Sequence, residues 1–289
     1  MRGVLTLAGE GTRMLPWTRG LRKEFLPLFG RSADGRPILK PVAHHVLETM
    51  VGAGVTEITL VVGAKDTAFV RNYFTIDRAF LARHAHHRER LKETERFYRT
   101  LGRLKLTFAV QPRPRGFGDA VLRAEPSVDG ESFLLHAGDA VLLERVPGTI
   151  LKALAHRLTA GRLDAVLLVR PVEDARRYGV VEGDPLPRDG RFGRLRVRRM
   201  EEKPARPRSH WAATAAYALS SRIFPALRAV RRRRPGRELE LTDAIEAILE
   251  DGGAVEALKL APSVGEWWSV GSPDSFLRAL KRTEGLANR

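Results

Sequence analysis

The chain has 289 residues, 43% of them hydrophobic and 29% charged, which is the composition of a folded soluble protein with a sizeable core. It contains no cysteine and no apolar run near the roughly 20 residues that span a bilayer, so disulfides, thiolate chemistry and a membrane span are excluded. Its 50 Lys and Arg residues outnumber 34 Asp and Glu residues for a net charge of +16, which favours anionic partners, either nucleic acid or phosphorylated small molecules.

Short apolar runs alternate with longer amphipathic segments through the first half of the chain. The first run, 4–8, leads straight into glycines and is too short for a signal peptide, so we expect a core strand and a cytoplasmic protein. Further runs typical of buried strands are 57–62, 106–111, 132–136 and 164–169. Segments typical of helices are 38–51, 67–101, one beginning near 118–119, and 149–159. This alternation predicts an α/β fold in which helices flank a mixed, mostly parallel sheet.

The second half of the chain changes character. Antiparallel strands with turns are expected at 178–183, 190–204 and 210–220, and helices near 240–250 and 273–281. The basic run RRRRPG at 231–236 is interpreted as a solvated loop ahead of a helix, because no aromatic residues interleave with it to stack on bases. The absence of a repeat, a linker or a composition break indicates a single domain over 1–289.

A glycine-rich turn, AGEGTR, follows the first predicted strand. Gly9 and Gly11 allow positive φ and close approach to a ligand, and successive N–H groups in such a turn bind anions. The Walker pattern is absent, and Met14 stands where the dinucleotide pattern needs a third glycine. Arg13 adds a permanent cation suited to a bidentate phosphate contact, and Lys23 adds a mobile point charge. These residues favour a phosphate site that belongs to neither pattern, although many strand-ending turns contain glycine and Lys23 alone fits an ordinary surface lysine equally well.

Other polar residues fall at the carboxyl ends of predicted strands, where ligands bind in an open parallel sheet. Gln111 ends one strand, and Asp139 lies three residues beyond the run SFLLH. Each also has an ordinary explanation, Gln111 as a strand end and Asp139 as a turn residue. Glu202 and Lys203 likewise fit a surface ion pair. Taken singly, these residues leave both interpretations open.

Seven segments in chain order resemble the sugar-1-phosphate nucleotidyltransferases. They are LAGEGTRMLPWTRGLRKEFLPL, QPRPRGFGDAVLRA, HAGDAVLL, RYGVVEG, MEEKP, AAYALS and ELELTDAI. The likeness is nearest to the bacterial and archaeal UTP–glucose-1-phosphate uridylyltransferases, with the glucose-1-phosphate thymidylyltransferases as near relatives, so UTP and dTTP both stay open. In the first segment, Arg22 replaces the proline that is usual in the family.

The resemblance implies a Rossmann-like nucleotide-diphospho-sugar transferase fold with a smaller antiparallel sheet on the sugar side. The N-terminal half would bind a nucleoside triphosphate, and the C-terminal half would bind a hexose 1-phosphate. The expected reaction converts UTP and glucose 1-phosphate to UDP-glucose and pyrophosphate, with Mg²⁺ as cofactor. A homo-oligomer, either a dimer or a tetramer, is also implied, whereas membrane and nucleic-acid partners are not expected.

The resemblance also implies roles for the matched residues. Those expected to wrap the nucleotide are Ala8, Gly9, Gly11, Thr12 and Arg13, with Gln111 and Gly116 at the pyrimidine edge. Those expected around the sugar phosphate are Gly179, Glu202, Lys203 and Tyr217. Catalysis is expected from Arg13, Lys23, Asp139 and Lys203, with Asp139 holding Mg²⁺.

The expected chemistry needs no nucleophilic side chain, because the sugar-phosphate oxygen is already anionic at neutral pH and the transfer requires mainly positioning and electrostatics. Ser269 stands where the family's W-x-D-x-G segment carries an aspartate that often binds Mg²⁺. Three outcomes stay open: Asp139, phosphates and water suffice for the metal, activity is reduced, or the chain is a regulatory homologue. Asp119 is expected to cap the helix that begins beside it.

Overall fold

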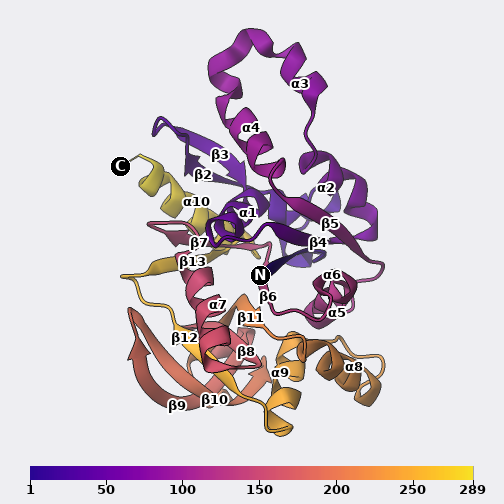
Figure 1. Ribbon diagram of the computed structural model, residues 1–289, viewed down its shortest axis with the longest axis vertical. Coiled ribbons are helices and arrows are strands. Elements are labelled where there is room, and N and C mark those ends of the chain that lie inside the picture. The colour runs from indigo at the N-terminus through magenta and orange to yellow at the C-terminus, as the bar shows by residue number, and fades with distance from the viewer. Residues whose placement is uncertain (289) are drawn as a thin grey trace.

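The structure is a computed structural model that describes residues 1–288. At its centre is a nine-stranded sheet with the order β5-β4-β1-β6-β11-β8-β12-β10-β9 (Figure 1). Its strands are β1 (Arg2–Leu7), β4 (Glu57–Gly63), β5 (Lys105–Gln111), β6 (Phe133–Ala137), β8 (Ala165–Pro171), β9 (Gly179–Asp189), β10 (Phe192–Glu202), β11 (Trp211–Leu219) and β12 (Val255–Lys259). Two smaller pairs join β2 (Pro27–Arg31) to β3 (Pro37–Pro41), and β7 (Ala140–Glu144) to β13 (Gly265–Ser269).

The central sheet is mixed, as the alternation of elements predicts. Strands β5, β4, β1 and β6 are parallel neighbours, and so are β8 and β12. Strand β11 runs antiparallel between β6 and β8, and β9 and β10 form an antiparallel edge. The expected antiparallel strands of the second half are therefore present, and they continue the same sheet.

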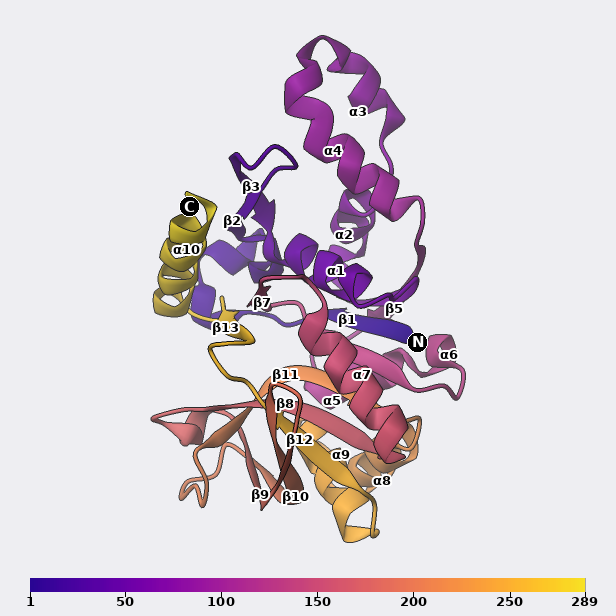
Figure 2. The ribbon, with the colours of Figure 1, turned by 60° about the vertical axis from the view of Figure 1, so that its left-hand side comes forward.

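Helices cover both faces of the sheet (Figures 1 and 2). They are α1 (Val42–Gly52), α2 (Thr67–Tyr73), α3 (Arg78–Arg83), α4 (Arg88–Leu101), α5 (Phe117–Arg123), α6 (Glu125–Val128), α7 (Thr149–Gly161), α8 (Ile223–Arg233), α9 (Leu241–Glu250) and α10 (Pro273–Ala287). Along β1, Leu5 and Leu7 belong to the core that includes α1 and α7, whereas Val4 belongs to the core that includes α5, α8 and α9. Side chains alternate across a strand, so β1 contributes to both cores.

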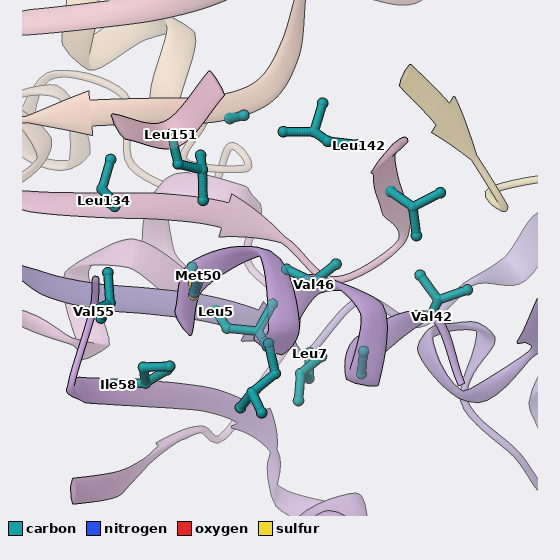
Figure 3. Packing of buried hydrophobic residues seen from close by; sticks show 14 of the residues in the cluster. Leu5, Leu7, Val42, Val46, Met50, Val55, Ile58, Leu134, Leu142 and Leu151 are labelled. Atoms are coloured by element: carbon teal, nitrogen blue, oxygen red, sulfur yellow. The ribbon is translucent and has the colours of Figure 1, made fainter. Parts of the chain in front are cut away.

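Helix α1 begins later than its apolar pattern predicts. Val42, Val46 and Met50 recur at i, i+4 and i+8, so they form one buried stripe beside β1 (Figure 3). The predicted helix over 38–51 is wrong at its start, because residues 38–41 belong to β3 and pair with β2. Pro41 disfavours helical backbone in the residue before it, so the helix begins only after this proline.

The basic run at 231–236 is also partly helical. Arg231, Arg232 and Arg233 form the exposed last turn of α8, a helix that the sequence interpretation missed. Ile223 and Leu227 lie on its buried face. Cations at a helix C-terminus are favoured by the helix dipole, which explains why the run stays helical rather than forming a loop.

The segment over 67–101 is mostly helical, as predicted, and is divided into α2, α3 and α4. Helices α3 and α4 form an arm that projects from the body of the molecule (Figure 1). Within residues 1–288, none of the helices is both long enough and apolar enough to cross a membrane.

Candidate active site

Loops that follow several strands meet around one cavity of about 550 Å³. It is lined by most of the residues that the sequence nominates, namely Ala8, Gly9, Gly11, Thr12, Lys23, Gln111, Gly116, Asp139, Gly179, Glu202, Lys203 and Tyr217. Arg13 instead lines an adjoining cavity of about 780 Å³. The two cavities share Asp139, Arg177 and Tyr178 in their walls, so all the nominated residues surround one continuous cleft.

The glycine-rich turn is held in a conformation that only glycine adopts readily. Gly11 has a φ of 66°, and a Cβ at this position would lie 2.9 Å from Cγ2 of Thr18. The Thr18 hydroxyl donates a hydrogen bond of 2.9 Å to the carbonyl of Gly11, and Arg22 donates one of 2.8 Å to the carbonyl of Gly9. Arg22 is itself ion-paired with Asp66. The arginine that replaces the usual proline therefore supports the turn.

Lys23 and Asp139 form an ion pair in the floor of the cleft. The ammonium Nζ of Lys23 lies 2.5 Å from Oδ2 of Asp139, and Lys23 is only 9% exposed. Burial opposes the charged form of both groups, but their mutual attraction outweighs it, so the pKa of Lys23 is raised and the pKa of Asp139 is lowered. The pair stays charged at neutral pH, as a buried ammonium beside a carboxylate.

Glu24 lies next to this pair and is almost completely buried. Its Oε2 atom has no hydrogen-bond partner among residues 1–288. Burial raises the pKa of Glu24 to about 7, although Lys23 acts in the opposite direction. Sequence reasoning assigned Glu24 no role, and its neighbours make it a buried counter-charge for Lys23.

Gln111 is oriented by two acceptors. Its Nε2 donates hydrogen bonds of 2.9 Å to Oδ2 of Asp119 and 3.2 Å to the carbonyl of Gly116. A carboxylate and a carbonyl can only accept, so the NH₂ group must face them and the amide oxygen remains available to a donor in the cleft. The prediction that Asp119 caps a helix is wrong: this residue is 1% exposed inside α5, and it makes no capping bond because it holds Gln111 and Arg123 instead.

Glu202, Lys203 and Thr242 form a second polar group at the other end of the cavity. The Thr242 hydroxyl donates a hydrogen bond of 2.7 Å to Oε2 of Glu202, and Lys203 Nζ lies 3.0 Å from Oε1 of Glu202. A Cβ at Gly179 would lie 3.0 Å from the Thr242 hydroxyl, so glycine there leaves room beside these polar atoms. Tyr217, 4% exposed on β11, completes this wall. Thr242 was missed as a site residue, although it lies in the segment ELELTDAI.

Lys203 has a backbone conformation that is unusual for a residue other than glycine. Its φ is 43°, a left-handed conformation that costs a non-glycine residue about 1–2 kcal/mol. Its N–H donates a hydrogen bond of 3.0 Å to the carbonyl of Tyr178. Backbone strain of this kind clusters at binding sites, because the surrounding structure must hold it in place.

Ser269 ends β13 directly beside Asp139. The N–H of Val270 donates a hydrogen bond of 2.8 Å to the Asp139 carbonyl, and the Ser269 hydroxyl accepts one of 3.1 Å from Gly271. A Cβ at Gly271 would lie 3.0 Å from Nη2 of Arg13 and 3.2 Å from Oγ of Ser269. Position 269 is therefore adjacent to both Asp139 and Arg13, where a carboxylate would face the same space.

The side chains of Asp139 and Ser269 could bind magnesium only if substrate phosphates and water supplied the remaining ligands. Among residues 1–288, no three His, Cys, Asp or Glu side chains gather as a metal cluster. Mg²⁺ is commonly bound through one or two carboxylates, with water and substrate phosphates as its other ligands. Asp139 meets that minimum as one carboxylate, and Ser269 contributes a neutral hydroxyl beside it.

Comparison with known proteins gives a consistent result. Residues 2–285 match the family model described as nucleotidyl transferase. The chain is 29% identical to UTP–glucose-1-phosphate uridylyltransferase of Mycoplasma pneumoniae, over 96% of this chain and 90% of that protein. It is 27% identical to glucose-1-phosphate thymidylyltransferase of Neisseria gonorrhoeae, over 100% of this chain and 84% of that protein. A UTP-bound UDP-glucose pyrophosphorylase structure from Acinetobacter baumannii is similar, with a TM-score of 0.78 at 26% identity over 98% of this chain and 93% of that one.

Proposed function

Since this chain belongs to the nucleotidyl transferase family and is a sugar-1-phosphate nucleotidyltransferase, we propose that it forms UDP-glucose and pyrophosphate from UTP and glucose 1-phosphate. The main support is that one cleft contains the glycine turn, the Lys23–Asp139 pair and the Lys203–Glu202 pair. The nucleotide would occupy the N-terminal half of the cleft and the sugar phosphate the C-terminal half.

The nucleotide end offers contacts for a triphosphate and for a pyrimidine. The N–H groups of the glycine turn and the guanidinium of Arg13 would bind the phosphates. The oriented amide oxygen of Gln111 would accept a hydrogen bond from the N3–H group of the pyrimidine. Uracil and thymine both carry this N3–H group, so this contact with Gln111 would suit UTP and dTTP alike.

The reaction is an in-line displacement at the α-phosphorus. A phosphate oxygen of glucose 1-phosphate forms a bond to this phosphorus, the bond from the phosphorus to the bridging oxygen of the β-phosphate breaks, and pyrophosphate leaves with that electron pair. No protein base is required, because the attacking oxygen is already ionised. Lys203 would hold the sugar phosphate, and Lys23 with Arg13 would stabilise the charge that develops on the transferred group and the leaving group.

Asp139 would hold magnesium together with substrate phosphates and water. When bound, the ion supplies positive charge to the phosphate oxygens. Lys23 pairs with Asp139 in the structure, so its ammonium would shift toward the phosphates as the carboxylate takes up a new partner. The proposal also includes a homo-oligomer, dimer or tetramer, which light scattering coupled to size-exclusion chromatography would test.

A matrix of nucleotides against sugar 1-phosphates, with products identified by mass, tests the proposed function. We expect UDP-glucose and pyrophosphate to be the fastest products with magnesium present. Faster formation of dTDP-glucose would favour the thymidylyl reaction instead. If no nucleotide yields a nucleotide sugar although the protein is folded, the chain is a regulatory homologue and the proposal is wrong.

Asp119→Ala should weaken nucleotide binding although Asp119 lies behind Gln111. Loss of this charged acceptor frees the amide to rotate, and we expect the Kd for UTP to rise about tenfold, which corresponds to one hydrogen bond to a charged group. Titration calorimetry with UTP measures the change. Asp251→Ala, at an exposed aspartate that directly follows the last residue of α9, serves as the control and should bind UTP like the parent protein. Equal UTP affinity in both variants would show that Asp119 has no part in nucleotide binding.

Ser269→Asp should strengthen magnesium binding. The new carboxylate would stand beside Asp139 and provide a second anionic oxygen ligand, so we expect the magnesium concentration for half-maximal activity to fall roughly tenfold. Metal titration of the initial rate and of tryptophan fluorescence measures it. Ser275→Asp, on α10 in the wall of the adjoining cavity, controls for added charge alone. An unchanged magnesium requirement would mean that position 269 is not a ligand position in this chain.

A further inference from the structure

The sugar end of the cleft carries more carboxylates than the proposed reaction uses. Glu202, Glu238 and Glu240 all line the same cavity, beside the single ammonium of Lys203. Glu202 is already engaged, by the Thr242 hydroxyl and by Lys203. Glu238 and Glu240 have no assigned role; both line the cavity with Lys203, and their charges contribute to raising the pKa of Lys203.

Of these two glutamates, Glu240 is the better placed to act on a bound sugar. It is half-buried immediately before α9, and its side chain makes no capping bond to that helix, whereas Glu238 is exposed. The charges of Glu202 and Lys203, on β10 and just after it, and of Glu238 on its own segment act on the Glu240 carboxyl group. The backbone N–H of Phe117, the first residue of α5, also acts on this group as a hydrogen-bond donor. Glu240 therefore makes no capping bond to α9, and its carboxyl group lines the cavity in which the sugar ring would lie.

We propose that Glu240 selects sugars by their charge: the site accepts neutral and amino hexose 1-phosphates and rejects hexuronic acid 1-phosphates. The inference rests on the proposed function, because it concerns the sugar half of the same cleft. Glu240 is a specificity-determining residue here, acting through its charge on the sugar ring, remote from the phosphorus at which bonds change.

The balance of charge in the cavity wall supports this selection. Lys203 is paired with Glu202 and would also meet the phosphate of the sugar, so it has little attraction left for a second anion on the ring. Lys23 is paired with Asp139. Arg177 lines both cavities and is exposed, so solvent screens its charge. A carboxylate at C6 of the sugar would therefore meet carboxylates, whereas an ammonium at C2 would be attracted to them.

Discrimination against hexuronic acid 1-phosphates should depend on pH. Burial, together with the charges of Glu202 and Glu238, raises the pKa of Glu240 to about 7, against the opposing effects of Lys203 and the Phe117 backbone. Below pH 7 the group is protonated and neutral, and it becomes an anion as the pH rises through 7. Rejection of uronic acids should therefore strengthen between pH 6 and pH 8.

The test compares kcat/KM for glucose 1-phosphate, glucosamine 1-phosphate and glucuronic acid 1-phosphate, each with UTP, at pH 6 and pH 8. At pH 8 we expect Glu240→Gln to improve glucuronic acid 1-phosphate relative to glucose 1-phosphate by about tenfold, and to lower the relative use of glucosamine 1-phosphate. At pH 6 both shifts should become smaller. Glu250→Gln, an exposed glutamate at the other end of α9, is the matched control and should leave all three ratios unchanged.

Two further measurements keep this inference separable from the proposed function. Kd values of the three sugar phosphates are measured by calorimetry with the α,β-imido analogue of UTP, which does not react. If the Kd values differ with the charge of the sugar but no nucleotide sugar is formed, the proposed function is contradicted and the inference is supported. If Glu240→Gln turns over glucose 1-phosphate and its kcat/KM ratios among the three sugar phosphates equal those of the parent protein, the inference alone is contradicted. If Glu240→Gln does not fold, Glu238→Gln at the exposed position should shift the ratios in the same direction by a smaller factor, and unchanged ratios there overturn the inference.

Discussion

Asp139→Ala should abolish magnesium-dependent turnover, with kcat reduced by at least about a thousandfold. Two effects combine in this variant. The carboxylate that would hold the metal is lost, and Lys23 loses the partner that lies 2.5 Å from its ammonium. Initial rates of pyrophosphate release across a magnesium titration measure the first effect. Steady-state kinetics like those of the parent protein would overturn the role assigned to Asp139.

The same variant has a predictable cost in stability. Removing one member of a buried ion pair leaves the other charge buried without its partner, which destabilises the fold. Glu24 limits this cost, because it remains beside Lys23 and its pKa falls once the charge of Asp139 is absent. We expect a loss of roughly 1–3 kcal/mol in the free energy of unfolding, measured by denaturant titration. Asp139→Asn preserves the volume and isolates the charge: its turnover should also be lost, which separates catalysis from packing.

The parts of the site that lie within one short segment were predictable from the sequence. The glycine turn with Arg13 and Lys23 carries its chemistry in its residue types, and the order of the seven segments identified the rest. Gln111 and Asp139 were nominated because ligands bind at the carboxyl ends of parallel strands, and the structure brings both into one cavity. The mixed sheet followed from the alternation of apolar and amphipathic segments.

Residues whose partners are distant in sequence were not predictable. Asp119 suits a helix cap by its residue type, and only the approach of β5 to α5 turns it toward Gln111. Thr242 becomes a partner of Glu202 only when α9 packs beside β10, 40 residues earlier in the chain. The pairing of β7 with β13 places Ser269 against Asp139. These roles depend on tertiary contacts that no local pattern encodes.

Lys203→Ala should impair the use of glucose 1-phosphate far more than the use of UTP. Lys203 is the cation that we propose holds the sugar phosphate, so its loss should raise the KM for glucose 1-phosphate about a hundredfold, the value of a contact between a charged donor and a phosphate. The KM for UTP should change little, because the glycine turn and Gln111 remain intact. Steady-state kinetics with each substrate varied in turn measure the two constants. A larger rise in the KM for UTP would assign Lys203 to the nucleotide end.

Comparing Lys203→Gly with Lys203→Met separates the charge of this residue from its left-handed backbone conformation. Both variants lose the ammonium, so both should show the same defect with glucose 1-phosphate. Glycine relieves the left-handed backbone at φ 43°, whereas methionine retains its cost. The exposed ion pair with Glu202 adds little stability of its own. Lys203→Gly should therefore melt at a higher temperature than Lys203→Met while remaining equally defective. That result would mean that the backbone is kept in an unfavourable conformation so that the ammonium reaches the cleft; equal melting temperatures would exclude such strain.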